Sequence, residues 1–159
     1  MIERYAIVGN SGSGKSTLAR RLAKTGALPV LDLDTVAWVP DAPTTLRPTE
    51  QAADGVQAFC RSHESWIVEG CYGELIRATL PFAPKLILLD PGLVQCLANC
   101  RARPWEPHKY ASKAEQDKNL AFLLEWVEGY YSRCDDLSLQ AHKTLFAEYD
   151  GENTHQTTL

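Results

Sequence analysis

The chain has 159 residues, a length that suits one compact domain, so we expect a single domain over residues 1–159. Its formal net charge of −4 at pH 7 argues against nucleic acid or an anionic membrane as the main partner, because such partners need a basic surface. The five cysteines form no Cys-x-x-Cys pair and no apolar run approaches the roughly 20 residues of a membrane span, so we expect a cytoplasmic protein with free thiols.

A glycine-rich segment follows the first predicted strand, which covers residues 5–8. The segment consists of Gly9, Asn10, Ser11, Gly12, Ser13, Gly14, Lys15, Ser16 and Thr17. Its spacing is that of the phosphate-binding loop Gly-x-x-x-x-Gly-Lys-[Ser/Thr], in which glycines let backbone N–H groups approach phosphate oxygens. A helix predicted over residues 18–24 directs its positive N-terminal end at the same anion. The pattern predicts a binding site for a nucleoside triphosphate.

Two side chains of this segment have distinct expected roles. Lys15 is expected to reach the β- and γ-phosphates, and the hydroxyl of Ser16 is expected to bind Mg²⁺. The predicted cofactors are therefore ATP and Mg²⁺. The sequence leaves open whether ATP or GTP is preferred.

Two acidic residues lie at the end of the second predicted strand, which covers residues 30–34. Asp32 and Asp34 have period-two spacing, so both side chains are expected on the same side of the strand. Ligands of parallel α/β sheets bind outside the carboxyl ends of the strands, where such acids can serve a metal and an acceptor. Solvated acids at a strand end are the alternative.

An apolar stretch over residues 35–43 follows and ends in a proline-rich loop. Its Trp38 either lines an acceptor pocket or caps the core. A helix is then predicted to begin near residues 47–50 and to end near residues 62–65.

The third and fourth predicted strands, residues 66–70 and 86–89, both bring an acid to their carboxyl end. Glu69 is a candidate for the acid near magnesium in a phosphate-binding-loop site. Asp90, which follows four apolar residues, fits the same pattern. The residues alone leave the choice between the two acids open.

A loop of unusual composition follows the helix predicted over residues 92–100. It contains the cations Arg101, Arg103 and Lys109 together with two prolines and two large aromatic residues. Such a loop can close over a triphosphate, because guanidinium groups make bidentate contacts with spread negative charge. We expect a lid near residues 101–112, with a solvated basic turn as the alternative.

The C-terminal third is predicted to begin with the longest helix, residues 112–133, which carries an apolar packing stripe. A short helix over residues 135–141 and a fifth strand over residues 144–149 are expected next. Residues 154–159 are polar, and we expect them to form a loose tail.

Three segments together carry a family resemblance: the strand and phosphate-binding loop, residues 34–38, and residues 69–72. They resemble the nucleoside-monophosphate-kinase-like branch of P-loop proteins. Within it the chain is similar to small bacterial adenylate-kinase-like and shikimate-kinase-like proteins, including those labelled topology modulation proteins. The resemblance implies a three-layer α/β/α P-loop NTPase fold with a five-stranded parallel sheet of order 2-3-1-4-5. It also implies that ATP binds at the open end of the first strand.

The resemblance also implies residue roles. Asp34 matches an acceptor-binding acid, and Glu69 matches a magnesium-side acid. Arg101 and Arg103 match the lid arginines. Two departures favour an acceptor different from those of the named enzymes: Gly73 stands where the Asp-Gly-Phe-Pro-Arg segment of adenylate kinases has arginine, and the glycine-rich acceptor loop of shikimate kinases is absent.

We therefore predict an enzyme that transfers the γ-phosphate of Mg·ATP to a small molecule, either a nucleotide, a nucleoside or a hydroxy metabolite. Positioning and charge stabilisation supply the rate of such a reaction. The predicted catalytic residues are Lys15, Asp34, Arg101 and Arg103, and the predicted metal-site residues are Ser16, Asp32 and Glu69. An ATP hydrolase and a nucleotide-dependent regulatory module are the alternatives.

Overall fold

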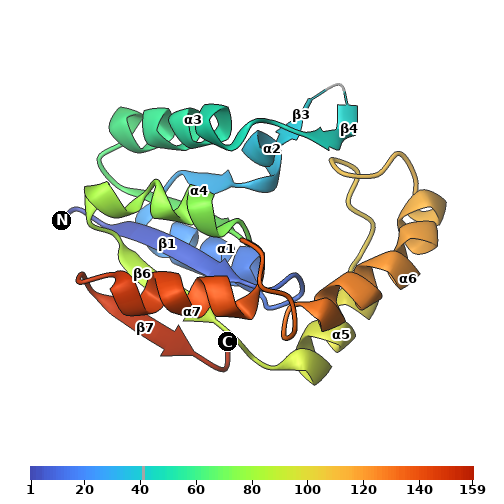
Figure 1. Cartoon of the computed structure of the whole chain (residues 1–159). Coiled ribbons are helices and arrows are strands. Elements are labelled where there is room, and N and C mark those ends of the chain that lie inside the picture. Colours follow the sequence, from blue (N-terminus) through green and yellow to red (C-terminus); the bar gives the residue numbers. More distant parts are fainter. Residues whose placement is uncertain (41) are drawn as a thin grey trace.

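A five-stranded parallel sheet lies at the centre of the computed structural model, which describes residues 1–40 and 42–159. Its strand order is β2-β5-β1-β6-β7, and helices cover both faces (Figure 1). The strands are β1 (Arg4–Gly9), β2 (Val30–Asp32), β5 (Trp66–Gly70), β6 (Lys85–Leu89) and β7 (Asn153–Gln156). This architecture confirms the predicted three-layer α/β/α fold and the order 2-3-1-4-5.

The central strand β1 is apolar on both faces. Ala6, Ile7 and Val8 have no exposed surface, and full burial of a side chain such as valine or isoleucine contributes about 1.5–3 kcal/mol. The strands β5 and β6 flank β1 in parallel, so that Ile7 lies opposite Glu69 and Ile87. Because the strands run in one direction, their carboxyl ends meet at one edge of the sheet.

The two faces of the sheet are covered by different helices. On one face Ala6 and Val8 join a core with side chains from α3 (Thr49–Ser62), α4 (Gly73–Arg77) and α7 (Leu139–Glu148). On the other face Ile7 packs with Leu18 and Ala19 of α1 (Lys15–Gly26). A short 3₁₀ helix, Leu80–Phe82, precedes β6. Both faces of the sheet are therefore buried, as the apolar strands predict.

The second strand is shorter than predicted. It ends at Asp32, because the chain turns there and begins α2 (Asp34–Ala37). The N–H of Asp34 donates to Oδ1 of Asp32 at 2.9 Å. Asp34 therefore lies in the first turn of a helix, and the expectation that both acids share one side of a strand is wrong.

A small antiparallel pair follows α2. It consists of β3 (Trp38–Val39) and β4 (Ala42–Leu46). The proline-rich loop predicted near residues 40–43 includes residue 41, which lies outside the described residues.

The C-terminal part of the chain differs most from the prediction. Residues 144–149 were predicted as a strand, but residues up to 148 belong to α7, whose His142 and Leu145 are both buried on one side. The hydroxyl of Ser138 caps this helix by accepting from the N–H of Ala141. The fifth strand is β7 instead, and it includes residues 154–156, for which a loose tail was expected. Its polar side chains fit the exposed edge of the sheet.

Two helices form a separate pair near the carboxyl edge of the sheet, α5 (Leu93–Arg101) and α6 (Lys113–Gly129) (Figure 1). Cys96 and Cys100 of α5 are buried against Val127 of α6. The segment between the two helices, residues 102–112, is called the lid loop below. Within the parts of the chain that the structure describes, no helix is long and apolar enough to span a membrane.

Candidate functional site

The predicted phosphate-binding loop joins β1 to α1. Residues 10–14 form the loop, and Lys15, Ser16 and Thr17 form the first turn of the helix. Gly12 and Gly14 have φ angles of +77° and +96°, which side chains with a Cβ rarely adopt. The loop therefore has the backbone conformation that its glycines predict.

The N-terminal end of α1 offers hydrogen-bond donors. The N–H of Leu18 donates to the carbonyl of Gly14 at 2.9 Å, but among the described residues no backbone carbonyl accepts from the N–H groups of residues 14–17. Such groups at a helix start carry partial positive charge and bind anions. The loop thus fits a phosphate chain.

The ammonium group of Lys15 lies inside this loop. Its Nζ donates to the carbonyl of Asn10 at 2.6 Å, and the residue is only 9% exposed. A buried charge of this kind gains from an anionic partner. The position fits the predicted contact of Lys15 with the β- and γ-phosphates.

Two helices hold the loop from outside. The amide of Asn10 donates to the carbonyl of Val127 in α6 at 3.1 Å, and the amide of Asn99 in α5 donates to the carbonyl of Gly12 at 2.7 Å. Asn10 was predicted only as a cofactor-binding residue, and no pattern in the sequence pointed to Asn99. The two contacts fix the base of the α5/α6 pair on the phosphate-binding loop.

Ser16 meets Glu69 at the carboxyl end of β5. The Ser16 hydroxyl donates to Oε1 of Glu69 at 2.8 Å, and Glu69 pairs in register with Asp32 on β2. Burial raises the pKa of both carboxyl groups, the charge of Asp34 raises both further, and Asp32 also raises the pKa of Glu69. The structure thus brings together the three residues predicted for the metal site.

These oxygen atoms fit a hard divalent cation. No group of three His, Cys, Asp or Glu side chains forms a metal cage within residues 1–40 and 42–159. Magnesium bound with a nucleotide needs no such cage, since one or two carboxylates suffice beside phosphate oxygens and waters. The donor set of Ser16, Asp32 and Glu69 meets that requirement.

Asp90, the other acid considered for magnesium, has different partners. Its Oδ1 accepts from the hydroxyl of Tyr131 at 3.0 Å and from the N–H of Gly92 at 3.3 Å. The acid that bonds to Ser16 is Glu69.

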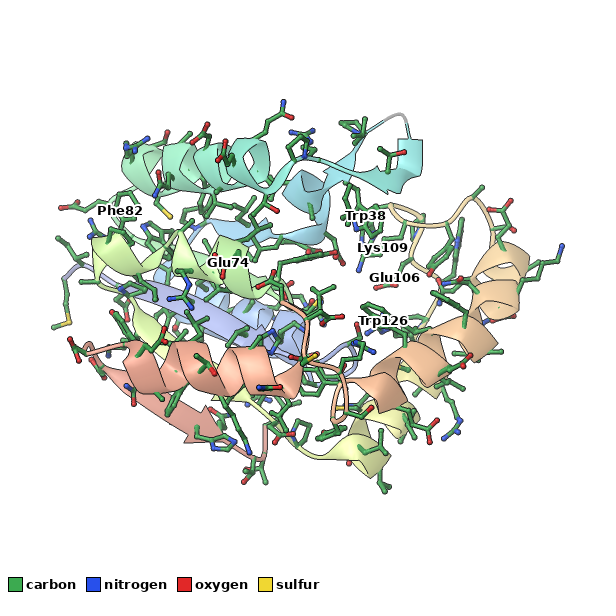
Figure 2. All side chains as sticks on the ribbon, viewed as in Figure 1. Trp38, Glu74, Phe82, Glu106, Lys109 and Trp126 are labelled. Carbon is green, nitrogen blue, oxygen red and sulfur yellow. The ribbon has the colours of Figure 1, made fainter. Side chains whose placement is uncertain are left out.

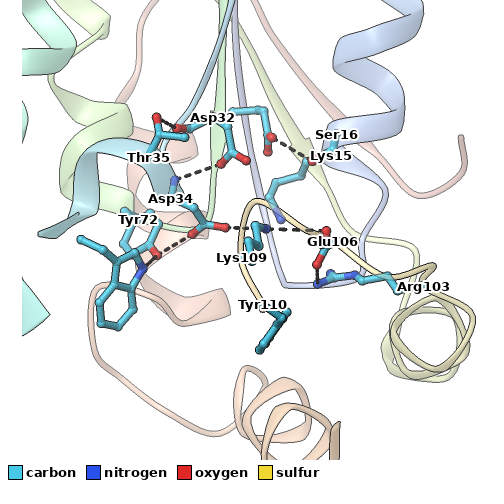
Figure 3. Close-up of polar contacts among 12 residues, drawn as sticks. Lys15, Ser16, Asp32, Asp34, Thr35, Tyr72, Arg103, Glu106, Lys109 and Tyr110 are labelled. Carbon is cyan, nitrogen blue, oxygen red and sulfur yellow. Dashed lines mark hydrogen bonds and ion pairs between the residues drawn. The ribbon is translucent and has the colours of Figure 1, made fainter. Parts of the chain in front are cut away.

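Asp34 lies at the centre of a second polar cluster (Figure 3). Its Oδ1 accepts from the hydroxyl of Tyr72 at 2.6 Å, and its Oδ2 pairs with Nζ of Lys109 at 2.9 Å. The indole N–H of Trp38 donates to the Tyr72 oxygen at 3.0 Å, while the ring packs at the edge of the core. Trp38 thus packs against the core, which is one of the two predicted arrangements, and its role in an acceptor pocket stays a prediction.

The charge state of Asp34 follows from these contacts. Burial by itself raises the pKa of the carboxyl group, but Lys109 and Tyr72 outweigh burial and hold this pKa below its usual range. Burial lowers the pKa of Lys109, yet Asp34 and Glu106 outweigh it and raise that pKa to about 12. The two groups are therefore an ion pair at neutral pH.

The predicted lid arginines lie in different surroundings. Arg103 in the lid loop pairs with Glu106 at 3.9 Å, and Glu106 also pairs with Lys109 at 3.8 Å. Arg101 is exposed at the end of α5 and makes no ion pair within the described part of the chain. Sequence reasoning missed Lys109 and Glu106 as site residues, although both lie in the basic loop that it singled out.

Comparisons with known proteins agree with this geometry. The AAA domain family matches residues 4–151. A search of curated proteins gave no match. Among solved structures, a sugar kinase from Janibacter sp. HTCC2649 aligns with a TM-score of 0.56 at 16% identity, over 98% of this chain and 84% of that chain.

Two further solved structures are similar. A gluconokinase from Sinorhizobium meliloti 1021 aligns with a TM-score of 0.52 at 14% identity, over 99% of this chain and 84% of that chain. A shikimate kinase from Bacteroides thetaiotaomicron aligns with a TM-score of 0.52 at 16% identity, over 80% of this chain and 79% of that chain. These structures share the fold. The family match spans most of the sequence and includes the phosphate-binding loop, so the chain belongs to the AAA domain family of P-loop proteins.

Proposed function

We propose that this protein is a kinase that transfers the γ-phosphoryl group of Mg·ATP to a hydroxyl group of a small molecule. One observation carries the proposal: the carboxylate Asp34 bonds through its N–H to Asp32, and Asp32 lies in register with the Glu69 that accepts from Ser16 of the phosphate-binding loop. Hydrolases of nucleotides need no such acid for an acceptor. A kinase needs one to orient the attacking hydroxyl.

The proposed roles follow from the donor sets. The N–H groups at the start of α1 and the ammonium group of Lys15 bind the phosphates. Ser16, Glu69 and Asp32 are the residues that would hold Mg²⁺, which neutralises phosphate charge when bound.

Transfer itself is an in-line displacement. The acceptor oxygen forms a bond to the γ-phosphorus, the bond from that phosphorus to the β,γ-bridging oxygen breaks, and ADP leaves. Asp34 accepts the hydroxyl hydrogen bond and then the proton, which passes to solvent. Arg103 and Arg101 are proposed to meet the charge of the transition state.

The charge of Asp34 supports a hydroxyl acceptor over a phosphate acceptor. An ionised carboxylate attracts an O–H donor and repels an anionic group. The names of the similar structures, a sugar kinase, a gluconokinase and a shikimate kinase, agree with a hydroxyl acceptor.

A ligand screen followed by one substitution tests the proposal. Polyols, sugars, hydroxy acids and nucleosides are screened by thermal shift with a non-hydrolysable ATP analogue, since a ligand of the folded state raises the melting temperature. The acceptors found are then assayed for ADP release. Asp34→Asn is expected to bind the ATP analogue normally and to lose acceptor-dependent ADP release by about 10²-fold or more.

Asp117→Asn is the control, because in the described part of the chain the Asp117 side chain pairs only with Lys113, on an exposed part of α6. Full acceptor-dependent activity in Asp34→Asn would exclude Asp34 as the acceptor acid. Phosphate release that no acceptor stimulates would favour a hydrolase, and ATP binding without turnover would favour a regulatory module.

A further inference from the structure

A chain of polar contacts runs from the core to the lid loop. It begins with Trp38 and Tyr72, passes through Asp34 to Lys109, and continues to Glu106. In Figure 2, Lys109 lies between Trp38 and Glu106. The acid assigned to the acceptor is thus also the acid that the lid loop contacts.

In the described part of the chain, the other hydrogen bonds of the lid loop go to itself, to the end of α5 and to α6. The indole N–H of Trp105 donates to the carbonyl of Tyr110, and Gln116 bonds to the backbone of residues 104 and 106. Among the residues whose side chains the structure describes, 1–40 and 45–159, the Lys109–Asp34 ion pair is the one hydrogen bond or ion pair that joins residues 102–112 to the sheet or to α1, α2, α3, α4 and α7. This ion pair is therefore the described polar contact through which the lid loop meets the acids at the end of β2.

That contact leaves hydrogen-bonding capacity at Asp34 for an acceptor. Tyr72 and Lys109 use one lone pair on each oxygen of Asp34, and a carboxylate can accept about four hydrogen bonds in all. An ammonium group has three N–H donors, of which one points to Asp34. A hydroxyl group bound at Asp34 can therefore lie beside the ammonium group of Lys109 while the loop is closed.

We propose that Lys109 is a positioning residue that couples closure of the lid loop to the acceptor site through its ion pair with Asp34. The loop closes when Lys109 reaches this carboxylate. Closure in turn fixes the carboxylate and excludes water from the phosphoryl group. The catalytic part of the inference rests on the proposed kinase function, whereas the closure of the loop does not.

Hydrogen exchange tests the closure without any turnover. Lys109→Met removes the ion pair, and the amides of residues 103–111 are expected to exchange about two- to fivefold faster, the range that a partly exposed ion pair supports. The amides of β1 and α1 are expected to keep their exchange rates, which shows that the variant is folded. Lys109→Arg keeps the charge and is expected to restore most of the protection.

The matched control is Lys113→Met. Lys113 is a cation in the next element with an ion pair of 3.3 Å to Asp117, and it makes no contact with Asp34. It is expected to leave the exchange of residues 103–111 unchanged. Equal exchange in wild type and Lys109→Met, or equal acceleration by Lys113→Met, would overturn the proposal that the Lys109–Asp34 ion pair holds the lid loop closed.

Kinetics then test the coupling. In Lys109→Met the KM of the acceptor is expected to rise and kcat to fall, while the dissociation constant of the ATP analogue stays the same. Unchanged acceptor kinetics in a variant with a faster-exchanging loop would overturn the positioning role. Failure of the kinase proposal would look different, since no acceptor would then stimulate ADP release in wild type.

Discussion

The phosphate-binding loop and the lid loop both contact the proposed reaction site, but they are held in different ways. The phosphate-binding loop is fixed by a buried hydrogen bond from Asn10, a partly buried one from Asn99 and the packing of α1. The lid loop is fixed by the ion pair of Lys109 with Asp34, whose side chains are 28% and 36% exposed. Folding therefore forms the predicted nucleotide site before any ligand binds, whereas the position of the lid loop depends on an ion pair.

The largest expected effect concerns the two arginines at the lid. Arg103→Ala is expected to lower kcat by about 10³-fold. This corresponds to about 4 kcal/mol of activation free energy, which is typical of an arginine that stabilises the charge of the transition state. Arg101→Ala is expected to have a smaller effect, since Arg101 lies outside the ion-pair cluster. Steady-state kinetics and titration with an ATP analogue measure both effects. A rise of a few-fold in the KM of ATP with unchanged kcat would exclude the role for Arg103.

An effect of intermediate size is expected on the pH dependence of stability, through His142, which is fully buried in the core. The carbonyl of Cys71 can only accept, so Nε2–H of His142 donates to it at 2.8 Å, and Nδ1 accepts from the hydroxyl of Tyr130 at 2.8 Å. Burial lowers the pKa of this imidazole to about 4, from 6.5 in an exposed histidine. The folded protein therefore keeps His142 neutral where the unfolded chain protonates it.

The sign of the pH effect follows. Above about pH 6.5 both states are neutral at this position, and below it only the unfolded chain gains the proton, so stability falls until about pH 4. Near pH 5 the titration of His142 is expected to lower the free energy of unfolding by about 2 kcal/mol. Urea unfolding at neutral pH and near pH 5 measures it, with His142→Gln as the comparison because glutamine can keep both hydrogen bonds. Equal pH dependence in the two proteins would contradict the assignment.

The smallest expected effect separates the two loops directly. Raising the salt concentration from about 0.1 M to about 1 M shortens the screening length from about 10 Å to about 3 Å, which weakens a partly exposed ion pair by less than about 1 kcal/mol. Hydrogen exchange in residues 103–111 is expected to become faster, while exchange in residues 10–19 stays the same. Equal acceleration of exchange in both segments would contradict the conclusion that only the lid loop is held by an ion pair.

The features that follow from local pattern could be predicted from the sequence. The glycine spacing predicted the conformation of the phosphate-binding loop, and the apolar run at residues 66–70 predicted β5 with the correct bounds. Residues 144–149 have strand-forming side chains, but burial of Leu145 beside the sheet makes most of them helical. The polar strand β7 has no apolar pattern at all, because it lies at an edge and is held by backbone hydrogen bonds to β6.

In the candidate site, too, local patterns could be predicted from the sequence and long-range contacts could not. The sequence named Lys15, Ser16 and Glu69, and the structure brings the last two into contact. It did not select Lys109 from three cations in one loop, since the ion pair with Asp34 joins residues far apart in the chain. The sequence placed both acids on one strand, because no local pattern showed that the chain turns after Asp32.

The hydrogen bonds from Asn10 and Asn99 have a consequence for substrate exchange. They anchor the base of the α5/α6 pair, so the hinge of any opening movement must lie within residues 102–112 rather than at the base of the helices. A hinge confined to this loop limits how far the proposed site can open, so we expect compact molecules to enter and polymers to be turned away. Product release through this opening is then expected to be quick, with departure of the nucleotide from the anchored base as the slower event of each cycle.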